Sequence, residues 1–116
     1  MRLKKQLAKL VALERVCRVS TAGRTGVPHV VPVCHVLADH KVYFGSERGA
    51  KKVANLRANP RVAVAVDLYA EEWTNLKGVM IQGTAALIER GPRFRKIRRD
   101  VIVEITPRHV FSWGIE

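Results

Sequence analysis

The chain has 116 residues, enough for one domain and too few for two. Its hydrophobic share of 47% is that of a globular protein and argues against intrinsic disorder. Lys and Arg number 21 against 10 Asp and Glu, so the formal net charge is +11. This excess favours an anionic partner but leaves open a nucleic acid, an anionic lipid surface, a phosphorylated small molecule, or a solvated basic surface without one partner.

The N-terminal residues 1–14 have the pattern of an amphipathic helix. Leu3, Leu7, Leu10 and Val11 are spaced as one apolar stripe. Because such helices more often pack on their own domain than on membranes, we expect this one to do so. No signal peptide and no membrane-length apolar run is visible, so we expect a soluble, cytoplasmic protein.

Most of the remaining chain reads as short strands. The first three are interpreted as a meander, and the second is apolar on both faces, which predicts burial on both. Pro32 should lie at a sheet edge or a bulge, and Gly83 suggests another bulge. This number of strands predicts a mainly β fold with a few short helices, closed or nearly closed into a barrel. The predicted strands are 16–20, 29–37, 41–46, 61–67, 78–89, 100–105 and 109–114.

Between these strands, Ala50, Val53 and Leu56 predict a short helix that ends at Asn59-Pro60. Residues 90–99 predict a short basic turn or helix, and "ADHK" (38–41) predicts a turn.

Side-chain sets typical of acid–base or metal chemistry are poorly represented. The four histidines are dispersed, and His29 and His35 would lie roughly 20 Å apart on one strand, too far to share a metal ion. We expect no metal site. Cys17 and Cys34 lack CxxC spacing and lie in apolar stretches, so we expect free buried thiols, although a disulfide stays open.

The most informative segment is "SERGAKK" (46–52), where a strand ends and a helix begins. Backbone N–H groups at the helix start, together with Arg48, Lys51 and Lys52, would form an anion pocket. A solvated lysine pair on a surface helix explains the spacing equally well.

Four segments taken together resemble the pyridoxamine 5′-phosphate oxidase-like, FMN-binding split-barrel proteins. They are "GVPHVVPV" (26–33), "KVYFGSERGAKKVANLRANPRVAVAVD" (41–67), "WTNLKGVMIQGTA" (73–85) and "PRHVFSWG" (107–114). The resemblance implies that residues 1–116 form one six-stranded, Greek-key-like split barrel. It also implies a homodimer with FMN at the subunit interface.

The resemblance assigns roles to individual positions. Lys52 matches the lysine that holds the flavin phosphate, Lys51 its basic neighbour, and Ser46 a hydroxyl residue that meets the phosphate. Trp113 matches a tryptophan that packs near the cofactor from the partner subunit, and Lys77 lies near another contact from that subunit. The strand expected along the flavin ring holds Val31, Pro32, Val33 and Cys34.

Some positions depart from the oxidases proper. Where those have an arginine and a lysine on the ring-contacting strand, this chain has Val30 or Val31 and His35, and it lacks their C-terminal arginine-histidine motif. We therefore expect a flavin-dependent oxidoreductase that is not a true pyridoxamine 5′-phosphate oxidase. The segment "DLYAEEWTNLKGV" (67–79) is more similar to deazaflavin-dependent reductases, so a deazaflavin coenzyme is the alternative.

Two further readings stay open. A basic β-barrel that binds nucleic acid fits the charge, but the aromatic residues form no evident stacking platform, which disfavours it. A protein that stores or senses the cofactor without turnover would carry the same binding residues.

Overall fold

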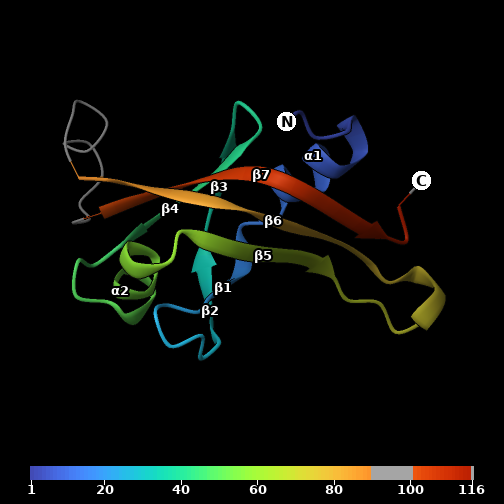
Figure 1. The fold of residues 1–116 in the computed structure, drawn as a ribbon. Coiled ribbons are helices and arrows are strands. Elements are labelled where there is room, and N and C mark those ends of the chain that lie inside the picture. The colour runs from blue at the N-terminus through green and yellow to red at the C-terminus, as the bar shows by residue number, and fades with distance from the viewer. Residues whose placement is uncertain (90–100, 116) are drawn as a thin grey trace.

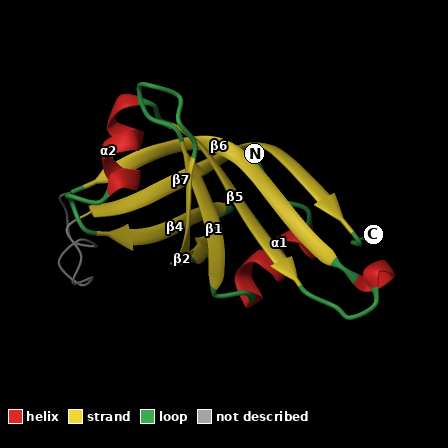
Figure 2. Ribbon diagram, turned by 90° about the horizontal axis from the view of Figure 1, so that it is seen from below, coloured by secondary structure: helices red, strands yellow, loops and turns green. Residues whose placement is uncertain are grey.

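The computed structural model describes residues 1–89 and 101–115. All seven strands in these residues belong to one antiparallel sheet in the order β2-β1-β5-β6-β7-β4-β3. Figure 2 shows this sheet curled into a half-barrel, with α1 and α2 at opposite ends. The elements are α1 (Lys5–Leu13), β1 (Val16–Thr21), β2 (His29–Cys34), β3 (Val36–Ala38), β4 (Lys41–Ser46), α2 (Lys51–Ala58), β5 (Arg61–Leu68), the 3₁₀ turn η1 (Trp73–Asn75), β6 (Lys77–Ile88) and β7 (Val101–Trp113).

The expected mainly β split-barrel class is confirmed. Within the described residues the sheet has seven strands rather than the six that the resemblance implies. One of the strands predicted from the sequence is divided in two, and two others are joined into one. The predicted basic segment 90–99 lies outside the described residues. No helix in the described ranges is long and apolar enough to cross a bilayer.

The hydrophobic core lies on the concave face of the sheet. Alternation in β5 buries Val62, Val64 and Val66, as the period of two predicts. Helix α1 adds Leu7 and Val11 to the same cluster, which confirms that the N-terminal helix packs on its own domain. In β1, β4 and β5 the alternate residues are less buried and lie on the other face.

The predicted strand 29–37 is wrong as a single element, because His35 interrupts it. This side chain is 7% exposed, and its Nε2–H donates to the carbonyl oxygen of Val11 at 2.8 Å. Its backbone N–H donates to the carbonyl oxygen of Arg15 at 2.9 Å, which continues the register of β2 with β1 up to His35.

The break at His35 sends β2 and β3 to opposite edges of the sheet, as Figure 1 allows the reader to follow. The antiparallel pairings of the predicted meander are present, because β2 pairs with β1 and β3 pairs with β4, but they are made by the two separate halves of the predicted middle strand. Pro32 lies on an edge strand, as predicted. Burial on both faces of this region is wrong, since Val30 and Val36 are each 64% exposed.

The turn between β3 and β4 confirms the prediction for residues 38–41. Ala38 pairs with Lys41, and the two residues between them, Asp39 and His40, have φ of 51° and 61°. Positive φ at both central positions is the geometry of a type I′ hairpin turn, whose twist suits the flanking strands.

The bulge predicted at Gly83 is also confirmed. Gly83 pairs with Pro107 and Gln82 pairs with His109, so Arg108 is an extra residue on β7. A Cβ on Gly83 would lie 2.2 Å from the carbonyl oxygen of Thr106, which explains the requirement for glycine. The bulge accommodates Pro107 inside β7, so the two strands predicted on either side of it are one strand, Val101–Trp113.

Candidate functional site

A cavity of about 470 Å³ opens where the end of β4 meets the start of α2 and the edge strand β2. Five of the residues predicted to hold a cofactor line it, although they come from three separate segments. The lining residues are Pro32, Val33, Cys34, Gly45, Ser46, Glu47, Ala50 and Lys52.

The start of α2 borders this cavity, since Ala50 and Lys52 line it. Ala50 occupies the N-cap position and has no side-chain acceptor, so no side chain caps the first turn. The first N–H groups of a helix have no partner within it and carry the positive end of the helix dipole. Lys52, half-buried in the cavity wall, adds a full positive charge. These groups fit an anion such as a phosphate.

Ser46 is 3% exposed, and its hydroxyl donates to the carbonyl oxygen of Glu47 at 3.2 Å. It would have to rotate to donate to a bound anion. Glu47 is the only carboxylate among the described lining residues, and it offsets part of the positive charge.

An apolar groove of about 340 Å³ lies next to this cavity. Cys34 and Gly45 line both spaces, so the groove and the cavity share a wall. The combined site is cationic at one end and apolar at the other. The groove is lined by Cys34, Val36, Ala38, Tyr43, Phe44, Gly45, Ile88 and Ile102.

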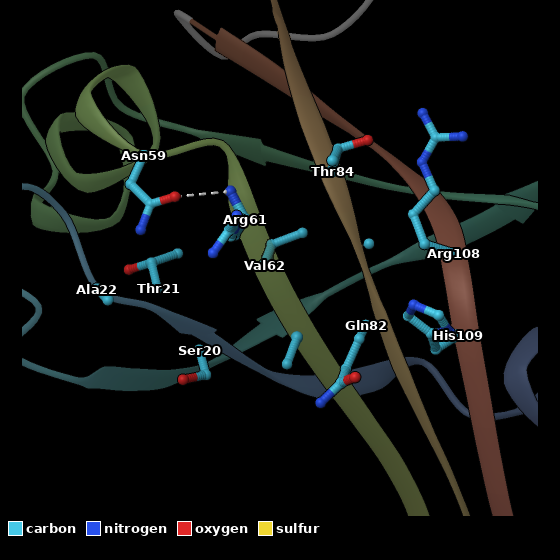
Figure 3. Close-up of a pocket in the computed structure, with 12 residues that line it drawn as sticks. Ser20, Thr21, Ala22, Asn59, Arg61, Val62, Gln82, Thr84, Arg108 and His109 are labelled. Carbon is cyan, nitrogen blue, oxygen red and sulfur yellow. Dashed lines mark hydrogen bonds between the residues drawn. The ribbon is translucent and has the colours of Figure 1, made fainter.

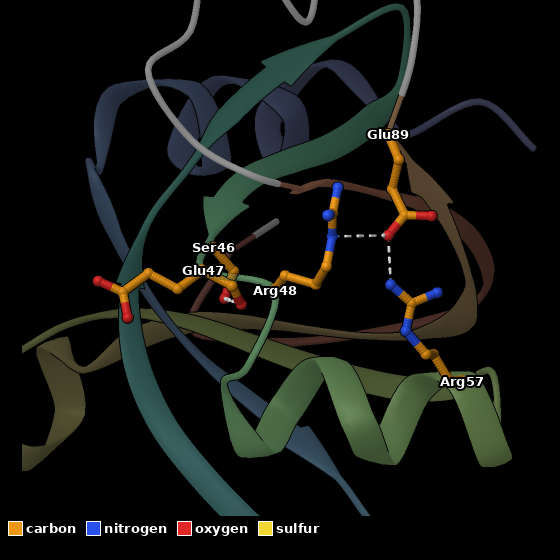
Figure 4. A network of polar contacts seen from close by, with 5 residues as sticks. All are labelled: Ser46, Glu47, Arg48, Arg57 and Glu89. Carbon is orange, nitrogen blue, oxygen red and sulfur yellow. Dashed lines mark hydrogen bonds and ion pairs between the residues drawn. The ribbon is translucent and has the colours of Figure 1, made fainter.

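Arg48 does not line the cavity. Its Nε lies 3.6 Å from Oε1 of Glu89, and Arg57 of α2 contacts the same carboxylate oxygen. Figure 4 shows both guanidinium groups directed at Glu89. This network ties the loop before α2 to the end of β6. Lys51 is exposed and does not line the cavity either.

Lys77 and Trp113 lie together at the other end of the sheet. Gly78 pairs with Trp113, and a Cβ on Gly78 would lie 2.0 Å from the indole ring, so this ring covers the glycine. Lys77 begins β6, whereas Ile88 at its end lines the apolar groove. A twelve-residue strand spans on the order of 35 Å. Within one chain, Lys77 and Trp113 cannot contact a small ligand held at Lys52.

Sequence reasoning missed the apolar groove. Tyr43, Ile88 and Ile102 read as ordinary strand residues, and their convergence depends on the pairing of β4 with β7 and of β7 with β6. The available signal was alternation, which places Tyr43 on the opposite face from the buried Val42 and Phe44. Val31, predicted to line the site, packs against the core instead of lining either space.

The two thiols differ in environment. Both are free, as predicted, but only Cys17 is buried, so the predicted burial of Cys34 is wrong. Burial raises the pKa of the Cys17 thiol to about 11. Because this folded-state value lies above the unfolded one, its contribution to stability is present below pH 9 and is lost as the pH rises toward 11.

Iodoacetamide at pH 8 should therefore alkylate Cys34 in the native protein and spare Cys17, because the thiolate is the reactive form and Cys17 is shielded. Peptide mass spectrometry locates the label. Unfolding in guanidinium chloride should expose both thiols. Equal native labelling of the two cysteines would contradict the burial of Cys17.

No group of three or more His, Cys, Asp or Glu side chains is arranged to hold a metal ion in residues 1–89 and 101–115. In these residues the site consists of a cationic cavity and an apolar groove.

Comparison with known proteins defines the class. Residues 3–114 match the sequence profile of the pyridoxamine 5′-phosphate oxidase family, and the chain belongs to that family. A 5a,11a-dehydrotetracycline/5a,11a-dehydrooxytetracycline reductase from Streptomyces rimosus is 33% identical over 105 residues, covering 85% of this chain and 74% of the relative.

Solved structures share the fold. An FAD-binding protein from Mesorhizobium loti superposes with a TM-score of 0.73 at 28% identity, over 90% of this chain and 86% of that one. The haem storage protein HutZ from Vibrio cholerae superposes with a TM-score of 0.81 at 16% identity, over 99% and 97% of the two chains. Because proteins of this fold are named for both FAD and haem, the fold alone does not identify the ligand.

Proposed function

We propose that this protein is a flavin-dependent oxidoreductase whose cofactor lies in the cavity and groove between β2, β4 and the start of α2. A flavin has an anionic phosphate tail and a flat, largely apolar ring. The site has matching ends, with Lys52 and the uncapped helix at one and the groove of Tyr43 and Ile102 at the other. The cationic cavity with an apolar groove next to it is the observation that carries the proposal.

The bound flavin would supply hydride or electron transfer, and the protein would supply binding and orientation. Lys52 and the N–H groups of α2 would neutralise the phosphate. The β2 segment Pro32–Cys34 would lie along the ring, and Ile88 and Ile102 would exclude water from one side. The reductase from Streptomyces rimosus supports a reduction of an unsaturated small molecule.

The proposal includes a homodimer. Lys77 and Trp113 lie too far from Lys52 to meet its ligand within one chain, but a twofold axis could bring the partner's copies to it. The end of β7 is available for this contact, since Phe111 and Trp113 are 50% and 43% exposed there. Two copies would then complete two sites.

The test is the absorption spectrum of the purified protein, followed by side-by-side titration with FMN and with a deazaflavin coenzyme. We expect saturable binding of FMN at one per chain and a dimer by light scattering. Tighter binding of the deazaflavin, whose acidic tail suits the net charge of +11, would change the cofactor but keep the site. Binding of neither would reject the function.

A further inference from the structure

A second cavity is separate from the proposed flavin site. Its volume is about 630 Å³, and it shares no lining residue with the cavity at Lys52. The two lie at opposite ends of α2, whose eight residues span about 12 Å. We call it the Arg61–Arg108 cavity. It is lined by Ser20, Thr21, Ala22, Asn59, Arg61, Val62, Ala63, Gln82, Gly83, Thr84, Arg108 and His109.

Strand register explains how the polar side chains gather there. Arg61 of β5 pairs with Thr84 of β6, and Gln82 of β6 pairs with His109 of β7. Directly paired side chains on one face are about 5 Å apart, and β5 and β7 are roughly 10 Å apart across β6. Figure 3 shows Arg61 and Arg108 on either side of Thr84.

The bulge opposite Gly83 has a direct effect on this cavity. In regular alternation Arg108 and His109 would point to opposite faces of β7. Because Arg108 is the extra residue, both side chains are exposed and line the same cavity. Neighbouring Gly83 and Ala63 are small, so they leave the floor hollow.

The lining is rich in donors. Asn59 Oδ1 accepts from the backbone N–H of Arg61 at 3.2 Å, which leaves its amide NH₂ group free to donate. No carboxylate is found among the described lining residues. Within the described ranges, neither the Arg61 nor the Arg108 guanidinium has an ion-pair partner, whereas Arg18 and Arg57 each pair with an acid.

We propose that the Arg61–Arg108 cavity binds the oxyanion group, phosphate or carboxylate, of a small molecule other than the flavin phosphate at Lys52. Two guanidinium groups without acidic partners offer several N–H donors in fixed planar geometry, which suits an oxyanion. This inference does not require the flavin proposal to be correct, because it rests on residues outside that site.

The test is a titration of the ¹⁵N-labelled protein with inorganic phosphate, and separately with acetate, at low ionic strength. Saturable chemical-shift changes of the Ala63, Thr84 and His109 backbone amides support anion binding in the cavity. A higher affinity for phosphate than for acetate indicates a phosphorylated ligand. An equal or higher affinity for acetate indicates a carboxylate ligand. No saturable shift with either anion at millimolar concentration overturns the proposal.

Variants assign the binding to the two arginines. The double substitution Arg61→Gln and Arg108→Gln should lower the affinity for the anion at least tenfold. Because both side chains are exposed, the variant should still fold. Arg24→Gln, an exposed arginine in the β1–β2 turn, is the matched control and should bind normally. Each variant must keep the native oligomer in light scattering.

Lys52→Ala separates this proposal from the flavin site. It should weaken FMN binding by about 10- to 100-fold while the anion shifts at Ala63 and Thr84 persist. If Lys52→Ala removes those shifts, or if the double arginine variant binds with unchanged affinity, the cavity is not an anion site.

Discussion

Replacing Lys52 with alanine is expected to weaken FMN binding by about 10- to 100-fold. The lysine lines the cavity at the start of α2, where no side chain caps the helix. A hydrogen bond to a charged group contributes about 1.5–3 kcal/mol, and about 1.4 kcal/mol corresponds to tenfold in affinity. Fluorescence quenching of FMN during titration of the apoprotein measures the change.

Lys51→Ala provides the matched control for this substitution. The two lysines are adjacent, but Lys51 is exposed and does not line the cavity. Its removal should change FMN affinity less than threefold. An equal or larger loss in Lys51→Ala would mean that the phosphate is held on the outer side of α2, and the site would have to be redrawn.

Gly83→Ala is expected to destabilise the fold by about 2–3 kcal/mol. The new Cβ would lie 2.2 Å from the Thr106 carbonyl oxygen and 3.3 Å from the Pro107 Cα, so backbone rather than a flexible side chain must move. For a domain of this size the melting temperature should fall by about 10 °C. Thermal unfolding followed by circular dichroism gives the value.

The same substitution at Gly49 is the control. Nothing lies within 4 Å of a Cβ built there, so Gly49→Ala should leave the melting temperature nearly unchanged. A comparable fall in both variants would show that the close contact at Thr106 is not the cause. Gly83→Ala should also lower the affinity of the Arg61–Arg108 cavity for anions, because the bulge that directs Arg108 and His109 to one face would be distorted.

Sequence patterns predicted local features well. The alternation of Val62, Val64 and Val66 in β5, the turn at 38–41 and the helix ending at Asn59 are each decided by neighbouring residues. The start of α2 was placed by the same kind of local signal. Its lysines could not be distinguished, because exposure of Lys51 and partial burial of Lys52 depend on how α2 packs on the sheet.

Predictions failed where a distant contact outweighed the local pattern. Residues 29–37 have the composition of one buried strand, but the hydrogen bond from His35 to the Val11 carbonyl oxygen breaks it. The strands on either side of Pro107 read as two elements, but the bulge opposite Gly83 joins them. In both cases the deciding partner is more than twenty residues away along the chain.

The class of the fold, the apolar faces, the turns and the cationic start of α2 follow from the amino-acid order, because these features depend on residue period and on neighbours within a few positions. The residues that meet across the sheet follow from strand order and register. Strand order brings Pro32 and Cys34 to Lys52, joins Tyr43 to Ile102 in one groove, and leaves Lys77 and Trp113 at the far end. Such pairings arise from curling of the whole sheet, whose free energy is shared among all seven strands.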